Sequence, residues 1–207
     1  MSTHQERWRR DWADAKLEPP DAVAPLLNQY REPHRAYHTV QHLDECFAWL
    51  DRVRHDAVEP HLVSLALWYH DAIYDPHRSD NEAASADLAV ASLRHAGADA
   101  TVLARVTELI LATRHSALPS PGDPTLLVDI DLAILGAPPA RFAEYEAQIR
   151  AEYRWVPGLV FRRRRAMILR GFLDRPALYH TALLHQELEA RARSNLAAAL
   201  SELGGQR

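Results

Sequence analysis

Apolar residues recur at three- and four-residue spacing along almost the whole chain, which is the period of an amphipathic α-helix. Alternating β-branched segments, which would indicate strands, are nearly absent. Alanine, leucine, glutamate and arginine dominate, and all four favour helices. The pattern predicts an all-α fold with helices at about 6–16, 21–30, 38–54, 61–69, 81–97, 100–115, 131–135, 139–153, 158–173 and 179–203.

Proline and glycine mark the breaks between these helices, and Asp21 is a plausible N-cap of the second one. The segment SALPSPGDP is expected to be a loop. Because the proline-rich stretches are short, none indicates a linker. We expect residues 1–207 to form a single helical bundle, with N-terminal helices in 1–30 and a C-terminal helix in 175–207 packed on the core.

Composition narrows the class of protein. The 207 residues are 47% hydrophobic and 25% charged, as in ordinary globular proteins, and the net charge of -4 argues against a DNA-binding domain. The single cysteine, Cys46, excludes an intramolecular disulfide and a zinc site built from cysteines. No apolar run reaches 18 residues and the N-terminus does not resemble a signal peptide, so we expect a cytoplasmic protein with no membrane partner.

Several histidines and aspartates fall within or beside apolar segments. His38 and His42 are four residues apart and share a helix face, and a His70-Asp71 pair ends the next core helix. Carboxylates in the apolar stretch LLVDIDLAILG are costly unless they are paired, cap a helix or bind a metal. A divalent cation, Mn²⁺, Fe²⁺, Co²⁺, Ni²⁺, Zn²⁺ or Mg²⁺, would compensate such a group of imidazoles and carboxylates.

The order His…His-Asp…Asp resembles the HD superfamily of metal-dependent phosphohydrolases. The segments YHTVQH, ALWYHDAIYD, DNEAASA, ILATRH, VDIDLAILG and IRAEYRWVP are similar to a bacterial group of predicted HD-superfamily phosphohydrolases, from about Tyr37 to Tyr179. The resemblance implies an all-α fold that holds a metal ion between helices. It implies as metal ligands His42, His70, Asp71 and Asp131. Asp129 competes with Asp131, although Asp129 is also a plausible helix N-cap.

Candidates for the general base are Asp71, Asp75 and Glu82. Some HD hydrolases of guanosine tetraphosphate carry Glu-Asp three and four residues after the HD aspartate, whereas this chain has Tyr74-Asp75. Only the second position of that pair, Asp75, agrees with those hydrolases. Glu82 lies in the first turn of a predicted helix, where the helix dipole stabilises a carboxylate in any case.

Candidates for substrate binding are His38, His115, Arg150 and Arg164. His38 either packs on Tyr37 or contacts substrate, and His115 either stabilises a helix C-terminus or lines the pocket. The run FRRRRAMILR is either a solvated face or a source of a phosphate contact such as Arg164.

The resulting expectation is a metal-dependent phosphohydrolase that acts on a nucleotide or another small phosphorylated compound. A non-catalytic metal- or nucleotide-binding sensor and a di-iron HD-type oxygenase are the alternatives. The apolar stripe of the C-terminal helix would pack either internally or against a second copy in a homodimer.

Overall fold

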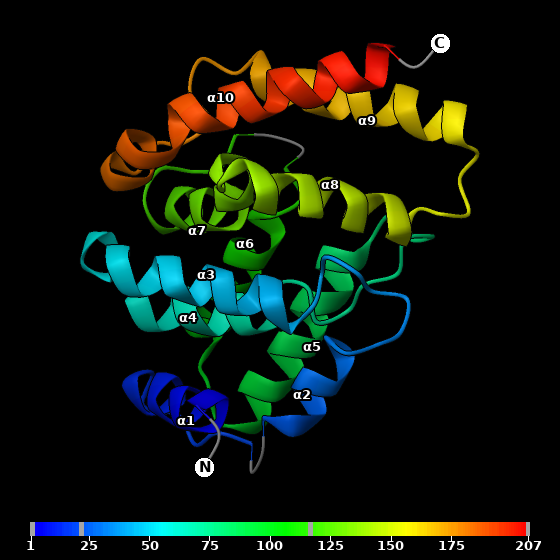
Figure 1. The fold of residues 1–207 in the computed structure, drawn as a ribbon. Coiled ribbons are helices and arrows are strands. Elements are labelled where there is room, and N and C mark those ends of the chain that lie inside the picture. The colour runs from blue at the N-terminus through cyan, green and yellow to red at the C-terminus, as the bar shows by residue number, and fades with distance from the viewer. Residues whose placement is uncertain (1–2, 21–22, 116–117, 206–207) are drawn as a thin grey trace. The chain divides into compact units, whose positions relative to one another are not determined.

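The computed structural model describes residues 3–20, 23–115 and 118–205. Within these ranges the chain forms ten α-helices and two 3₁₀ helices, with no strand, which confirms the all-α fold (Figure 1). The elements are α1 Thr3–Asp14, α2 Ala24–Gln29, α3 Val40–Val53, η1 Arg54–Asp56, α4 Pro60–Tyr69, α5 Asn81–His95, α6 Ala100–Ala112, α7 Asp123–Asp131, η2 Leu132–Gly136, α8 Pro139–Glu152, α9 Gly158–Leu173 and α10 Ala182–Gly205.

Most predicted helices occur with ends shifted by a few residues, and the predicted cap Asp21 lies outside the described residues. The prediction was wrong at α7, where a loop was expected up to residue 124 and a short helix only from 131. The helix instead begins at Asp123, with Pro124 in its first turn, a position that tolerates proline. Because residues 126–130 are all buried, α7 has no polar face, and its sequence lacks the amphipathic pattern.

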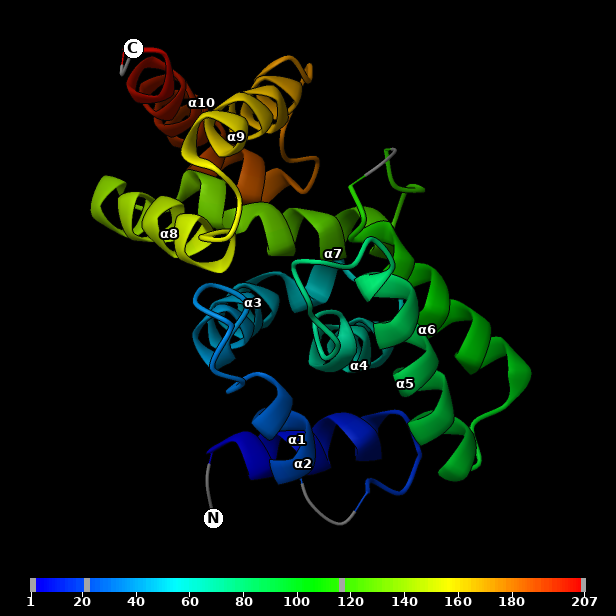
Figure 2. The same ribbon diagram turned by 90° about the vertical axis from the view of Figure 1, so that its right-hand side faces the viewer.

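The chain divides into two compact units, residues 1–128 and 129–207. In the first unit α4 is the central helix, packed against α1, α3, α5 and α6 (Figure 2). Every α4 residue from Leu62 to Tyr69 is buried, as expected for a helix covered on all sides. The loop that carries His70 and Asp71 follows directly, so the packing of α4 fixes where this pair lies.

A buried carboxylate ties α1 to α4. Asp11, which is fully buried, accepts hydrogen bonds from Ser64 Oγ at 2.6 Å and from Trp68 Nε1 at 3.0 Å. These two hydrogen bonds stabilise the Asp11 carboxylate, whose burial would otherwise lower the stability of the fold. The N-terminal helix is therefore held against the central helix by both apolar packing and a polar anchor.

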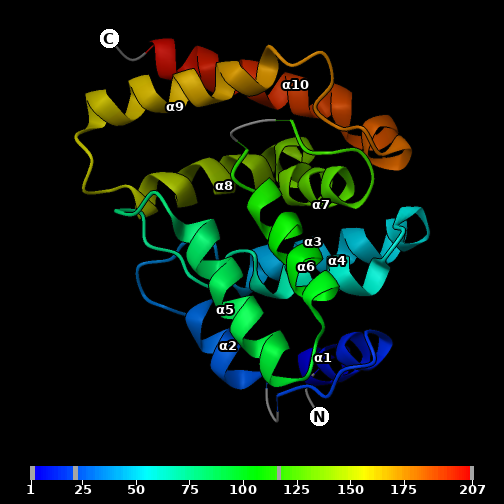
Figure 3. The same ribbon diagram turned by 180° about the vertical axis from the view of Figure 1, so that it is seen from behind.

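In the second unit α10 packs against α9 and η2, and α8 packs against η2 (Figure 3). The approach of η2 to α10 is close, since a Cβ added at Gly136 would lie 2.6 Å from Leu188 Cβ. Only glycine fits at this position without a shift of α10. That residues 1–207 form one domain stays a prediction. Among the described residues, no helix combines the length and apolarity needed to cross a membrane.

Candidate metal centre

Two histidines predicted as ligands face each other inside the first unit. His42 lies in the first turn of α3, where the Thr39 side chain accepts the backbone N–H of Gln41 and caps the helix. His70 follows the last residue of α4. The two side chains are buried, and their Nε2 atoms lie 3.2 Å apart. The two histidines are therefore close enough to bind one ion, and their role as ligands stays a prediction.

Asp71 completes a triangle of donor atoms. Its Oδ2 lies 3.1 Å from His70 Nε2 and 3.5 Å from His42 Nε2. Two ligands bound at about 2.1 Å to one ion, with tetrahedral or octahedral angles between them, lie about 3.0 to 3.4 Å apart. All three separations are close to this range, so the three atoms can form one face of a coordination polyhedron.

The far side of each imidazole is also fixed. His70 Nδ1 donates to the carbonyl of Leu67 at 2.8 Å, so Nε2 is the nitrogen that faces the triangle, where its proton bonds Asp71 and would give way to a bound ion. Tyr37 Oη lies 2.9 Å from His42 Nδ1 and holds that ring in place. Such outer contacts orient histidine ligands in metal sites. The arrangement therefore presents the donor atoms that a divalent cation requires.

The charge of Asp71 matches a ligand role. Its side chain is 17% exposed. Burial alone would raise its pKa, but the nearby His70 and His38 and the hydrogen bonds from His42 and His70 hold the pKa of Asp71 well below its ordinary value of 3.8. The carboxylate is therefore ionised at neutral pH and available to a cation.

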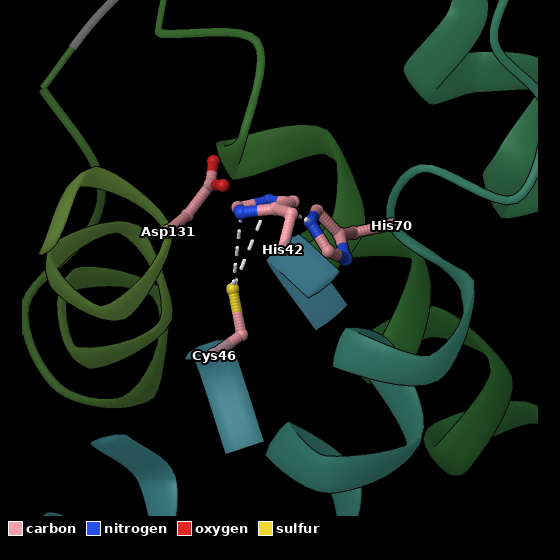
Figure 4. Close-up of side chains that lie close together, drawn as sticks. All are labelled: His42, Cys46, His70 and Asp131. Atoms are coloured by element: carbon pink, nitrogen blue, oxygen red, sulfur yellow. Dashed lines mark hydrogen bonds between the residues drawn. The ribbon is translucent and has the colours of Figure 1, made fainter. Parts of the chain in front are cut away.

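A wider group of ligand atoms surrounds His42. The ligand atoms of His42, Cys46 and His70, all in the first unit, lie within 4.8 Å of one another, and this buried group could hold a metal ion (Figure 4). Asp131 is the last residue of α7 and belongs to the second unit, and its role as a metal ligand stays a prediction.

Cys46 was missed as a candidate, because a single cysteine was considered only for disulfides and for sites built from cysteines. Its Sγ lies 3.7 Å from both His42 Nδ1 and His42 Nε2. The signal was available in the sequence, since residues four apart on a helix share a face. Thiolate is a soft ligand, so a mixed site with sulfur would favour Zn²⁺ or Fe²⁺ over Mg²⁺.

Arg35 is a second residue that sequence reasoning missed. Its guanidinium is buried and donates to the carbonyls of His38 at 3.1 Å, Asp71 at 2.6 Å and Ala72 at 2.8 Å. Its Nε donates to Glu32 at 3.0 Å. The guanidinium thus ties the segment before α3 to the backbone of the His70-Asp71 pair. No short motif marks this role, because all three acceptors are backbone atoms.

Asp129 binds the backbone of the segment that precedes α10. It is buried, and its Oδ2 accepts the backbone N–H groups of His180 at 2.7 Å and Thr181 at 2.6 Å. Burial raises the pKa of Asp129, while these hydrogen bonds lower it, and the net shift is upward. The prediction that Asp129 is a helix N-cap was wrong, because Asp129 lies inside α7 near its end and its side chain binds the segment that precedes α10.

The other candidates of the first unit have local partners. The His38 ring stacks on Tyr74, with centroids 4.0 Å apart, and it lowers the pKa of Asp71. Asp75 Oδ1 accepts the backbone N–H of His77 at 2.9 Å, which closes a turn.

Glu82 and His115 belong to neighbouring helix ends. Glu82, in the first turn of α5, lies 4.0 Å from Arg114 Nε. His115, three residues beyond α6, has a positive φ of 53°. The catalytic role of Glu82 and the substrate contact of His115 stay predictions.

Arg150 and Arg164 belong to the second unit. Arg150 donates to the carbonyl of Tyr153 at 2.7 Å and lies over the Phe161 ring at 4.7 Å, whereas Arg164 is exposed on α9. The buried member of the arginine run is Arg165, which pairs with Glu146. A phosphate contact by Arg150 or Arg164 stays a prediction.

Comparison with known proteins adds no assignment: no family model, no curated protein and no solved structure matches the chain.

Proposed function

We propose that this protein is a metal-dependent phosphohydrolase of the HD type that acts on a nucleotide or another small phosphorylated compound. The observation that carries the proposal is the triangle of His42 Nε2, His70 Nε2 and Asp71 Oδ2, with separations of 3.1 to 3.5 Å. Such a face leaves other coordination positions open. A divalent ion bound there would lower the pKa of water and offset charge on a phosphoryl oxygen.

The protein's own groups prepare this centre in defined ways. Asp71 supplies an ionised carboxylate, and His42 and His70 supply imidazole nitrogens that are oriented from behind by Tyr37 and by the Leu67 carbonyl. Because these orientations exist before any ligand binds, little reorganisation accompanies binding. Asp71, Asp75 and Glu82 remain the candidate bases that would take the proton of the attacking water.

On the substrate side, the proposal assigns phosphate contacts to cationic or hydrogen-bonding side chains, namely His38, His115, Arg150 and Arg164. His38 is the member of this set that acts on Asp71 electrostatically, and it is therefore the first to test. A planar guanidinium can bind two phosphate oxygens at once, which is the role proposed for the two arginines.

The deciding experiment measures phosphate release from a panel of nucleotides and small phosphate esters, with Mn²⁺, Co²⁺, Ni²⁺, Fe²⁺, Zn²⁺ or Mg²⁺ added. Bound metal is measured on the same preparations. The wild type is compared with Asp71→Ala and with Asp87→Ala, which removes an exposed carboxylate from α5 and serves as the matched control. We expect release by the wild type and by Asp87→Ala, and loss of release in Asp71→Ala.

The outcomes separate the alternatives. Equal background release from the wild type and Asp71→Ala would refute the hydrolase, and if metal and nucleotide still bind, the sensor function replaces it. Two irons per chain with a charge-transfer absorption band would favour the di-iron oxygenase.

A further inference from the structure

Helix α9 exposes a face on which aliphatic and cationic side chains alternate. The large aliphatic residues of this face are unusually open to solvent, with exposed fractions of 66% for Leu159, 42% for Val160, 69% for Met167 and 51% for Ile168. At about 100° per residue they spread over about half of the helix circumference. Three exposed arginines lie between them, and we call the seven residues the α9 face: Leu159, Val160, Arg163, Arg164, Met167, Ile168 and Arg170.

The arginines of the α9 face make no ion pair with any described residue. Helix α9 contains five arginines and no acidic residue. Of these, Arg165 is buried against Glu146. Within the described part of the chain, no hydrogen bond or ion pair involves the guanidinium groups of Arg163, Arg164 or Arg170. Their positive charge is therefore available to a partner.

Some surface arginines elsewhere have acidic partners. Arg54 lies 2.8 Å from Asp14, and Arg78 lies 2.8 Å from Asp80. The local balance of charge is also reversed, since residues 150–175 contain eight arginines and only two acidic residues, whereas the whole chain has a net charge of -4. Positive charge is thus concentrated on and around α9 in an otherwise acidic protein.

We propose that the α9 face docks on the surface of an anionic phospholipid bilayer. Val160 and Met167 at its centre would enter the headgroup region, while Arg163 and Arg164 on either side would extend toward lipid phosphates. Each arginine near an anionic bilayer adds an attraction that salt weakens. This peripheral contact departs from the expectation of no membrane partner, which considered only segments that span or enter a bilayer.

Other occupants fit the α9 face less well. A nucleic acid would use the arginines but gain little from the aliphatic centre, where aromatic side chains that stack on bases would be expected. A second copy of the chain would bring the same unpaired cations against each other. Neither argument depends on the proposed hydrolase activity, so the docking proposal stands or falls separately from it.

The test is co-sedimentation of the full chain with vesicles of phosphatidylcholine alone and of phosphatidylcholine mixed with phosphatidylglycerol. We expect binding only to the mixed vesicles, with an affinity that falls as salt is raised. Arg163→Glu with Arg164→Glu should weaken binding by at least about tenfold. Met167→Ser with Ile168→Ser should also weaken it, because less apolar surface would enter the interface.

Two matched controls make the result specific. Arg31→Glu with Arg94→Glu changes the net charge equally at exposed positions of the first unit, and Val58→Ser alters an aliphatic residue that is 78% exposed. Both should bind the mixed vesicles like the wild type, and circular dichroism confirms that every variant is folded. Three results would each overturn the proposal. The Arg31/Arg94 control could lose vesicle binding as strongly as the α9 variant, or the wild type could fail to bind mixed vesicles. The third is α9-dependent binding of an oligonucleotide or polyglutamate instead of vesicles.

Discussion

The guanidinium of Arg35 donates a 2.6 Å hydrogen bond to the backbone carbonyl of Asp71, which lies 36 residues later in the chain. The same side chain reaches the carbonyls of His38 and Ala72. A buried cation that serves three carbonyls is costly unless all its contacts are made. The position of the Asp71 carboxylate relative to the two histidines is therefore linked to a residue outside the ligand set.

Replacement of Arg35 should consequently weaken metal binding. We expect Arg35→Met to lower affinity for a divalent ion by about 10- to 100-fold, the range seen when outer contacts of metal ligands are removed. It should also cost about 2 to 4 kcal/mol of folding free energy, because three carbonyls lose their donor. Metal titration of the folded variant and urea unfolding measure the two effects, and Arg31→Met at an exposed neighbouring position is the control. An unchanged metal affinity in folded Arg35→Met would remove the positioning role.

Substitution of Cys46 can show whether this residue binds the metal ion or only packs beside the site. If its sulfur binds the ion, Cys46→Ala should reduce Zn²⁺ affinity more than Mn²⁺ affinity, by about tenfold in the ratio, because thiolate favours soft ions. Competition titrations with the two ions give this ratio. A parallel fall in both affinities would show that Cys46 only supports the His42 ring, from which its Sγ lies 3.7 Å.

Asp129 and Asp131 should respond in opposite ways to substitution by alanine. Asp129→Ala leaves the N–H groups of His180 and Thr181 without their acceptor and should cost about 2 to 4 kcal/mol of stability, with the bound ion retained. If Asp131 is a ligand, as the order His…His-Asp…Asp implies, Asp131→Ala should remove metal with a smaller loss of stability. Chemical unfolding and metal analysis of both variants check this pair. Loss of metal in Asp129→Ala at unchanged stability would exchange the two assignments.

We expect the free energy of unfolding to fall in alkaline solution because of the Tyr179 side chain. Its buried Oη donates to the Leu132 carbonyl at 2.9 Å, and burial raises the pKa of Tyr179 above its ordinary value of 10.0. The folded state therefore keeps the phenol proton where the unfolded chain releases it. The contribution to stability is complete below pH 10.0 and is lost as the pH rises above it.

Tyr179→Phe isolates this contribution. At neutral pH the variant should lose about 1 kcal/mol, the typical value of one hydrogen bond. Above pH 10.0 its stability should decline less steeply than that of the wild type, as measured by urea unfolding across the alkaline range. Identical slopes for both proteins would assign the alkaline loss to other groups.

The hydrophobic pattern by itself determined the helical class and most helix positions, because an amphipathic helix leaves a period of 3.6 residues in the sequence. The pattern was uninformative at α7, where residues 126–130 are buried on every side and no polar face exists to set a period. The order of His42, His70 and Asp71 could also be read from the chain, since an imidazole-carboxylate pair in an apolar run needs compensation.

Only the tertiary structure decided which groups meet around these residues. Arg35 binds backbone carbonyls, which every residue carries, so no side-chain motif indicates its contacts. Asp129 and Asp131 look equivalent in the sequence, and the fold alone shows that Asp129 accepts the N–H groups of the segment before α10. Contacts between distant segments depend on how helices pack, and packing is set by the whole core rather than by local spacing.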